Sequence, residues 1–360
     1  MGKIDEVVSK IVSVRLEMFT EAQKRLDNLT KPQGSLGKLE DIAKRLVAIK
    51  ENLNPSFGRK VIFVFAGDHG VAEEGVSAYP KEVTCQMVYN FLKGGAAINV
   101  LTEHVGAEVV IVDMGVAEDI EPHPLLKMKK VGYGTKNMLK EKAMTKEEAI
   151  QCVEVGIEVF EEEYKKNPVD MVGVGDMGIA NTTSSSAILA AISGEKVEDV
   201  TGRGTGVDDK IWQRKVDVVR KALQFHLPHV RGPLDVLSRV GGYEIGGIAG
   251  CIIAAASYKV PVVLDGFICT AGALIATELC PKLRDYLFAS HLSGEKGHRI
   301  ALEHLKLVPL LDLDLRLGEG TGAALAMSLI EASAKIISQM ATFEEAKVAR
   351  EINNKLNKCK

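Results

Sequence analysis

The chain has 360 residues, of which 46% are hydrophobic, and its formal net charge is −3. This length suffices for one large domain with an appendage, or for two modest domains. The charge argues against nucleic acid or an anionic membrane as the main partner. The N-terminus lacks the apolar stretch of a signal peptide, and the longest apolar run, Ile245–Ala256, is too short to span a bilayer. The six cysteines form no Cys-x-x-Cys pair, which fits reduced thiols. We therefore expect a cytoplasmic protein without a membrane or nucleic-acid partner.

The predicted elements fall into a helical start and an α/β body. Apolar residues recur at roughly helical spacing over residues 4–16, and a loop signal follows at 31–35. From residue 60, six short apolar runs indicate buried parallel strands, namely Val61–Ala66, Glu108–Asp113, Met171–Gly175, Pro261–Asp265, Tyr286–Ser290 and Leu310–Leu313. Helical patterns lie between or after them, for example Thr145–Tyr164, Asp208–Phe225 and Thr321–Met340. This alternation predicts a mostly parallel sheet covered by helices on both faces.

Glycine, hydroxyl and carboxylate residues follow nearly every predicted strand. They occupy residues 67–70, 114–115, 176–183, 266–267, 291–295 and 314–322. Ligands of such sheets bind outside the carboxyl ends of the strands. A sheet with only a structural role does not need these residue types at every end, so the pattern favours a functional site at this edge.

Two of these loops resemble anion-binding loops. Residues 173–178 carry glycines at a strand end, and the hydroxyl-rich segment Asn181–Ser186 then opens a helix, which suits a phosphate cradle. A Gly-Lys-Ser/Thr sequence is missing, so this is not a P-loop; a capped tight turn remains the alternative. Residues 202–206 suit a second phosphate or ribose loop, or a flexible linker capped by Asp208. The pair Asp208–Asp209 invites comparison with magnesium-dependent diphosphate-sugar transferases, but no apolar strand leads into it.

The segment 316–322, RLGEGTG, carries the sharpest local signal. Glu319 stands between two glycines that permit close approach of a ligand, just before a long predicted helix. In a dry pocket such a carboxylate can act as a general base; a simple helix-start charge is the alternative. Asp68 and His69 could suggest a metal pair, but no second cluster stands at ligand spacing, so we expect no metal. His291 and His298 flank the Ser293–Gly294 loop.

As a set, these loops resemble the nicotinate-nucleotide:dimethylbenzimidazole phosphoribosyltransferases. The resemblance runs from about residue 29 to residue 346. It is carried by motifs that follow one another along the chain, at residues 29–39, 66–71, 75–80, 83–87, 178–183, 201–206, 240–246, 264–267, 290–293 and 316–322. The resemblance implies a Rossmann-like six-stranded parallel sheet with a small helical domain built from both chain ends. We expect a helical segment over residues 1–55, an α/β catalytic domain over 56–340 and a C-terminal helix over 341–360.

The resemblance also implies a reaction and a set of site residues. The reaction joins nicotinate mononucleotide and dimethylbenzimidazole into α-ribazole phosphate and releases nicotinate, in a homodimer that needs no metal or other cofactor. Glu319 would be the general base and Gln86 would line the base slot. The remaining substrate contacts implied are Gly175, Asp176, Met177, Gly178, Ile179, Ala180, Asn181, Gly204, Lys215, Ser293, Gly294, Arg316, Leu317 and Gly318.

One departure and two alternatives accompany this interpretation. Many members of the family carry glutamate where this chain has Asp176, so a direct role for that carboxylate is in doubt. A related transferase could use another base, such as adenine, another benzimidazole or a phenol, because planar bases share a slot. A nucleotide- or base-binding regulator on the same fold is the non-enzymatic alternative; a regulator has no need of Glu319.

Overall fold

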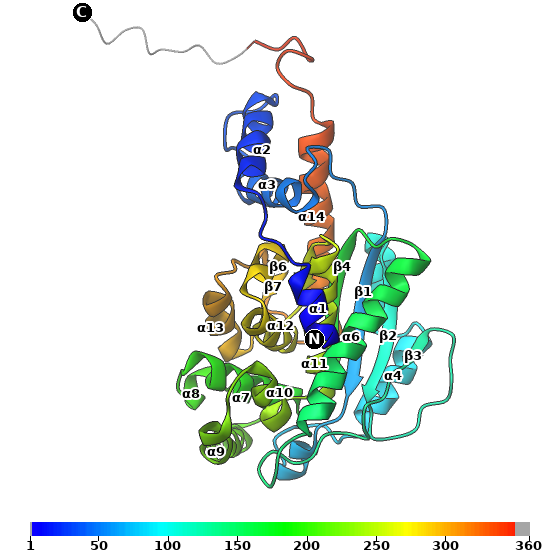
Figure 1. The fold of residues 1–360 in the computed structure, drawn as a ribbon, viewed down its shortest axis with the longest axis vertical. Helices are drawn as coiled ribbons and strands as arrows, with labels where there is room; N and C mark the ends of the chain where they lie inside the picture. Colours follow the sequence, from blue (N-terminus) through cyan, green and yellow to red (C-terminus); the bar gives the residue numbers. More distant parts are fainter. Residues whose placement is uncertain (1, 350–360) are drawn as a thin grey trace, which may run out of the picture. The chain divides into compact units, whose positions relative to one another are not determined.

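The computed structural model describes residues 2–349, and its larger unit is built on a six-stranded parallel sheet (Figure 1). The strands are β1 (Lys60–Gly67), β2 (Glu108–Gly115), β3 (Leu126–Met128), β4 (Met171–Met177), β5 (Val262–Leu264) and β6 (Leu287–Ala289). Their order is β3-β2-β1-β4-β5-β6, and every pair is parallel. Successive strands are added on one side of β1 up to β3 and then on its other side from β4 on, so the strand order switches between β1 and β4, which is where open α/β sheets bind ligands.

The predicted mostly parallel six-stranded sheet is confirmed, but the prediction of its sixth strand was wrong. Residues 310–313 do not join the sheet; β8 (Leu311–Asp312) instead pairs with β7 (His291–Leu292) in a separate two-stranded sheet. Leu313 is 52% exposed, so this run is not buried on both faces as a central strand would be. The sixth strand is β3, whose three residues include a lysine and give no apolar pattern.

Helices connect the strands and agree with the three predicted helical segments. The helices are α1 (Lys3–Ser9), α2 (Leu16–Asn28), α3 (Lys38–Lys50), α4 (Val83–Leu92), α5 (Ala97–Val105), α6 (Lys146–Lys166), α7 (Asn181–Ser193), α8 (Val197–Val200), α9 (Asp209–His226), α10 (Pro233–Val240), α11 (Tyr243–Ser257), α12 (Phe267–Leu279), α13 (Lys296–Leu305) and α14 (Thr321–Gln339). Short 3₁₀ helices lie at Gly70–Glu74, Leu227–His229 and Pro281–Tyr286.

The sheet is covered on both faces. Phe63 of β1 contacts the ring of Phe160 on α6, so α6 and α11 cover one face. Ile62 points the other way, toward the start of α14 and toward α5. The apolar run 245–256 forms most of α11, which is buried throughout between the sheet and α6. The longest hydrophobic segment of the chain is therefore a core helix.

Glycines let α6 and α11 pack backbone against backbone. A Cβ atom at Gly250 would lie 1.9 Å from the carbonyl oxygen of Val153, and one at Gly156 would lie 2.0 Å from that of Gly247. Real Cβ atoms do not approach so closely, so any side chain at either position forces the two helices apart. This contact lies at the centre of the larger unit.

We expect Gly250→Ala to lower the free energy of unfolding by several kcal/mol, because separating two packed helices opens voids across the core. Urea unfolding followed by circular dichroism measures the change. Gly232→Ala is the matched control: a Cβ atom there meets no atom within 4 Å and the backbone is extended, so it should shift stability by roughly 1 kcal/mol at most. Equal midpoints for the two variants would contradict this account of the helix contact.

Within the described range, the second unit comprises residues 14–56 and 329–349, and it is mainly helical. Its core gathers α2, α3 and the end of α14 through Met18, Ala22, Leu26, Leu29, Ala43, Val47, Ala48 and Ile337. Leu29 also forms an antiparallel bridge with Thr342. Lys31 and Glu40 form a buried ion pair at 2.8 Å beneath the loop at residues 31–37.

The bounds of the two units differ from the expected ones at both ends. Residues 2–13 group with the sheet, because α1 packs against α11 and α6. Residues 329–340 group instead with the helical unit. Of the expected C-terminal helix at 341–360, residues 341–349 form a bridge and turns, and residues 350–360 lie outside the described range.

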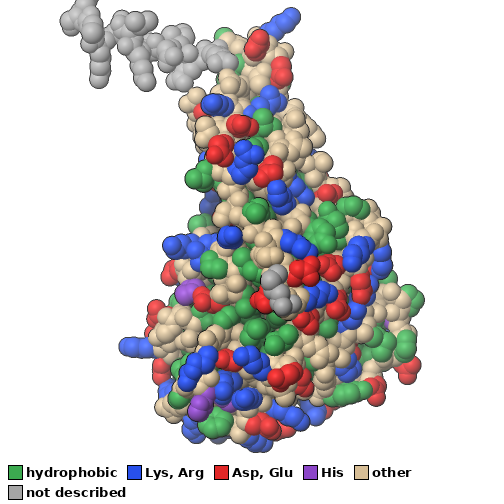
Figure 2. Space-filling view, in the orientation of Figure 1, with side chains coloured by type: hydrophobic (Ala, Val, Ile, Leu, Met, Phe, Trp, Pro, Cys, Tyr) green, Lys and Arg blue, Asp and Glu red, His purple; other side chains and the backbone are tan. Residues whose placement is uncertain are grey.

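The surface carries both charge signs. Figure 2 shows Lys and Arg side chains interspersed with Asp and Glu over the visible face. Within residues 2–349, no helix combines the length and the apolar character that crossing a bilayer requires.

Candidate active site

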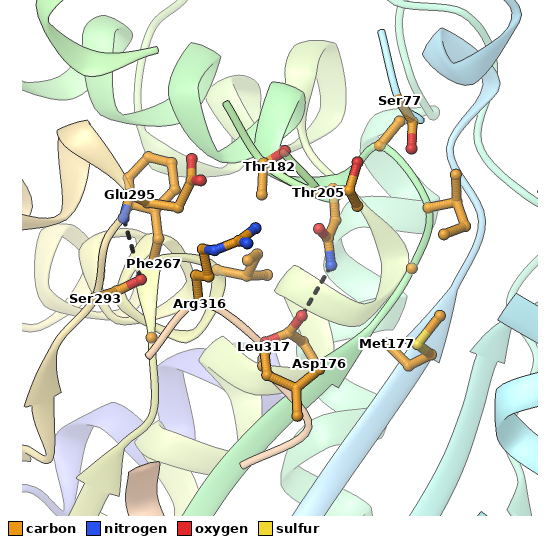
Figure 3. Close-up of a pocket in the computed structure, with 18 of the residues that line it drawn as sticks. Ser77, Asp176, Met177, Thr182, Thr205, Phe267, Ser293, Glu295, Arg316 and Leu317 are labelled. Carbon is orange, nitrogen blue, oxygen red and sulfur yellow. Dashed lines mark hydrogen bonds between the residues drawn. The ribbon is translucent and has the colours of Figure 1, made fainter. Parts of the chain in front are cut away.

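A pocket lies at the carboxyl end of β4, on the edge of the sheet where the sequence predicts a site. Six segments supply its wall, and Figure 3 shows their side chains converging on one cavity. The lining residues are Val76, Ser77, Asp176, Met177, Gly178, Ile179, Ala180, Asn181, Thr182, Gly204, Thr205, Gly266, Phe267, Ile268, His291, Ser293, Glu295, Arg316, Leu317 and Gly318. The loops predicted from separate parts of the sequence therefore meet.

The start of α7 is suited to hold an anion. Ala180, the residue before the helix, has no side-chain acceptor and adopts φ 72°, a left-handed conformation that costs a non-glycine residue about 1–2 kcal/mol. The preceding loop is held from α4, where Thr84 Oγ1 accepts a hydrogen bond from the Ile179 amide at 3.1 Å. The α7 start has no side-chain cap and lines the cavity, an arrangement that favours a phosphate.

A buried lysine stands behind this helix start. Lys215 on α9 is fully buried, and its Nζ donates to Thr182 Oγ1 at 2.7 Å. Burial lowers the pKa of Lys215 to about 8, against a smaller opposing effect of the Glu295 charge. Arg316 adds a second cation; in Figure 3 its side chain lies in the cavity between Ser293 and Thr205. Arg316 thus faces the cavity beside the helix start, and Lys215 stands behind that helix start.

The loop at Ser293 is fixed by a neutral histidine. His298 Nδ1 accepts a hydrogen bond from the Ser293 amide at 2.9 Å, and Nε2 lies 3.0 Å from Thr270 Oγ1. Burial lowers the pKa of His298 to about 3, with a contribution from His291. An unprotonated Nδ1 is required to accept from an amide, so the two observations agree. The Ser293 hydroxyl in turn accepts from the amide of Glu295 at 3.3 Å.

Two buried carboxyl groups, Asp176 in the pocket wall and Asp265 behind it, have different protonation states. Asp265 accepts hydrogen bonds from the amides of Gly320, Gly322 and Ala323 at the start of α14, and burial still raises its pKa to about 7. Burial, followed by the charges of Asp265 and Glu244, raises the pKa of Asp176 to about 8. The three amide donors favour the anion at Asp265, so Asp176 is the group that carries a proton near neutral pH. A protonated Asp176 is a poor general base.

Glu319 occupies the loop just beyond the pocket wall. It adopts φ 65°, is 4% exposed, and its Oε2 accepts from the amide of Ile98 at the start of α5 at 3.2 Å. Burial raises the pKa of Glu319, and the Ile98 amide partly opposes the shift. The loop packs directly on β4, because a Cβ atom at Gly175 would lie 2.4 Å from the Glu319 carbonyl oxygen. Glu319 is thus a buried carboxylate with a pKa shifted toward neutrality.

Most of the predicted contact residues come together, and some do not line the pocket. Those in its wall are Asp176, Met177, Gly178, Ile179, Ala180, Asn181, Gly204, Ser293, Arg316, Leu317 and Gly318. Gly175 and Lys215 lie behind the wall. Gly294 lines an adjoining hollow, and Gln86 is exposed on α4 outside the pocket lining. Glu319 is also outside that lining, with its carboxylate directed at α5.

The structure adds wall residues that were not singled out as contacts. Phe267, Ile268 and Val76 give the pocket apolar surface, and Glu295 and His291 give it polar groups. Phe267 and His291 stand in segments that carry the family resemblance, which was the available signal. Glu295 ends the strand-end segment 291–295, but its close packing against Gly202 could not be read from the sequence.

The Asp68–His69 segment is fixed by buried hydrogen bonds to two helices. His69 is fully buried; its Nδ1 lies 2.9 Å from Ser184 Oγ on α7, and its Nε2 lies 2.6 Å from Glu244 on α11. This chain of hydrogen bonds ties the end of β1 to the helix that carries the anion site. No group of three or more His, Cys, Asp or Glu side chains within residues 2–349 is arranged to hold a metal ion.

A second hollow adjoins the pocket on the side of α9. It shares Gly204, Glu295 and Arg316 with the pocket and adds Trp212, whose indole Nε1 donates to the Thr201 carbonyl at 3.0 Å. The Arg203 guanidinium lies 6.0 Å from the centre of the Trp212 ring. The two cavities therefore have a common wall.

Comparison with known proteins agrees with this geometry. The family model described as "Phosphoribosyltransferase" matches residues 11–348. The nicotinate-nucleotide–dimethylbenzimidazole phosphoribosyltransferases of Citrifermentans bemidjiense and Geobacter metallireducens are 55% and 56% identical to this chain, over 97% of it and 99% of their own lengths. The crystal structure of the enzyme of that name from Thermus thermophilus superposes with a TM-score of 0.89 at 47% identity, covering 93% of this chain and 99% of that one. The chain belongs to this phosphoribosyltransferase family.

Proposed function

We propose that the protein transfers the phosphoribosyl group of nicotinate mononucleotide to dimethylbenzimidazole, giving α-ribazole 5′-phosphate and nicotinate in cobalamin nucleotide-loop assembly. The observation that carries the proposal is an anion cradle, built from the α7 start, Lys215 and Arg316, next to an apolar wall and a buried Glu319. Relatives more than half identical over nearly the whole chain bear the name of this enzyme.

The reaction needs a phosphate-binding site, an apolar surface for the base and a group that accepts a proton. The glycosidic nitrogen of nicotinate mononucleotide is already cationic, so nicotinate leaves as a neutral ring nitrogen. The cradle grips the phosphate, and Phe267, Ile268 and Leu317 offer apolar surface to a flat base. As one imidazole nitrogen of the base attacks the anomeric carbon, the other must lose its proton, and we assign that proton to Glu319. Gln86 is proposed to line the base slot.

The test is turnover. Nicotinate mononucleotide and dimethylbenzimidazole, mixed with the protein, should release free nicotinate and give a product with the mass of α-ribazole 5′-phosphate. A panel of adenine, other benzimidazoles and phenols fixes the preferred base. Binding of nicotinate mononucleotide with no release of nicotinate for any base would instead support the regulator alternative, against which the intact Glu319 argues.

Catalysis should need no divalent metal, because no pyrophosphate has to be neutralised and the leaving group is already activated. Exhaustive dialysis against EDTA is expected to leave the turnover rate unchanged. A loss of activity that magnesium restores would overturn this expectation.

We also propose that the protein is a cytoplasmic homodimer in which the N-terminal helices of one subunit complete the base pocket of the other. Exposed apolar side chains near the chain start, Leu16 at 77% and Val12 at 47%, support a covering partner. Light scattering should give the dimer mass at micromolar concentration. A fully active monomer would contradict the proposal.

A further inference from the structure

His291 lines the pocket, and the reaction described above gives it no role. It follows β6 by two residues, and its side chain is only 3% exposed. Its ring lies against the start of α14, because a Cβ atom at Gly322 would be 2.0 Å from Nδ1. A Cβ atom at Gly266 would lie 3.8 Å from Nε2 and 3.9 Å from the Cβ of Ser293. The Nε2 edge therefore faces the side of the cavity that Ser293 lines.

The neighbours of the ring determine which nitrogen carries the proton. Ser290 Oγ lies 2.9 Å from Nδ1 and donates its one hydroxyl proton to the carbonyl oxygen of Asp265 at 3.2 Å. A hydroxyl that donates to this carbonyl meets the imidazole as an acceptor. The carboxylate of Asp265, 3.9 Å from Nδ1, also favours a proton there. Both contacts assign the proton to Nδ1 and leave Nε2 with a free lone pair.

An unprotonated Nε2 in a cavity can accept a hydrogen bond from a ligand. Burial lowers the pKa of His291 to about 4, so the ring stays neutral at physiological pH. A phosphate or a nicotinate carboxylate offers only acceptors, which excludes them as partners. The proposed function assigns the N–H of the base to Glu319, so that N–H is not the partner of Nε2. The hydroxyl groups of a ribose are the remaining donors of the substrate class.

We propose that Nε2 of His291 accepts a hydrogen bond from one hydroxyl group of the ribose, so that His291 selects ribose over deoxyribose. The inference rests on the proposed function for the identity of the sugar phosphate. Gripped at its phosphate by the α7 start, the sugar extends along the wall that Ser293 and His291 form. Asp265 and Ser290 act as positioning residues, because they hold the imidazole in the accepting tautomer.

The experiment compares nicotinate mononucleotide with its 2′-deoxy and 3′-deoxy analogues. Dissociation constants come from calorimetry without an acceptor base, and kcat/KM comes from turnover with dimethylbenzimidazole. The wild type should bind one of the two deoxy analogues roughly 5- to 100-fold more weakly, because the loss leaves a buried acceptor unpaired. In His291→Phe the ratio of the dissociation constants of that deoxy analogue and of nicotinate mononucleotide should fall to near one. His291→Gln, which puts an amide oxygen near the position of Nε2, should recover part of it.

Each result has a defined meaning. Discrimination by His291→Phe equal to that of the wild type, or a wild type indifferent to both hydroxyl groups, overturns the inference. If His291→Phe does not fold, Ser290→Ala keeps the imidazole but removes its Nδ1 partner, and unchanged discrimination in that variant overturns the inference as well. His304→Gln, on the surface side of α13, is the histidine control and should match the wild type. Absence of nicotinate release in the wild type would count against the proposed function alone, since the binding comparison does not depend on transfer.

Discussion

Glu319→Gln is expected to lower the turnover rate by about a hundred- to ten-thousand-fold while the affinity for nicotinate mononucleotide changes little. The amide keeps the size of the side chain and can still accept from the Ile98 amide, but it cannot take the proton of the base. The phosphate contacts, which set the affinity for the nucleotide, lie on other segments. Stopped-flow or steady-state release of nicotinate, with calorimetry for binding, separates the two effects.

Asp176→Asn is the matched comparison for Glu319→Gln, because Asp176 is the competing candidate for the general base. Because burial and the charges of Asp265 and Glu244 raise the pKa of Asp176 to about 8, the native side chain is mainly protonated at pH 7, and asparagine imitates that form. The variant should keep most of its turnover. Loss of nearly all turnover in Asp176→Asn, with little loss in Glu319→Gln, would move the base to Asp176.

The pH profile gives a second check on Glu319. A base acts only when it is ionised, so the rate should fall as the pH drops through the pKa of Glu319. Burial raises that pKa above the usual range for a glutamate, and the acidic limb should therefore lie higher than for an exposed carboxylate. The limb should be absent from the residual activity of Glu319→Gln.

Lys215→Met should weaken nicotinate mononucleotide binding by roughly one to two orders of magnitude and at the same time stabilise the fold. The first effect is the loss of a charged donor to the phosphate, worth about 1.5–3 kcal/mol. The second follows from the pKa of Lys215, which burial lowers to about 8 from 10.5. The unfolded chain therefore binds this proton more tightly than the folded chain does. Below pH 8 the buried charge lowers the free energy of unfolding by about 3 kcal/mol, and this loss disappears as the pH rises from 8 to 10.5.

Urea unfolding at pH 7 and pH 10 tests the stability half of this prediction. The wild type should gain more stability than Lys215→Met between those pH values, and the variant should be the more stable at pH 7. Binding of the phosphate should also raise the pKa of Lys215, so calorimetry at pH 8.5 in buffers of different ionisation enthalpy should detect proton uptake in the wild type only. Equal proton uptake by both proteins would place the titrating group elsewhere.

Elements with a repeating hydrophobic pattern could be predicted from the sequence, whereas contacts that depend on how distant segments pack could not. Buried strands such as β1 and β4 are continuous apolar runs, and glycines mark their ends, so the sheet and the edge that binds ligands were predictable. Strand β3 was not predictable, because its three residues, one of them a lysine, are too few to show a hydrophobic pattern. Likewise, Glu319 stood out between its glycines, but its contact with Ile98 depends on how α5 meets a distant loop. The raised pKa of Asp176 comes first from burial and then from the charge of Asp265, which lies far away in the chain.

The only tryptophan of the chain lines the hollow that adjoins the pocket. Trp212 neighbours Arg203, and Gly204 and Arg316 belong both to its hollow and to the anion cradle. The protein thus contains its own optical probe: excitation near 295 nm reports one indole, without the background that several tryptophans would give. Occupancy of the cradle can be followed by the emission of the unlabelled wild type, and each variant above can be titrated in the same way.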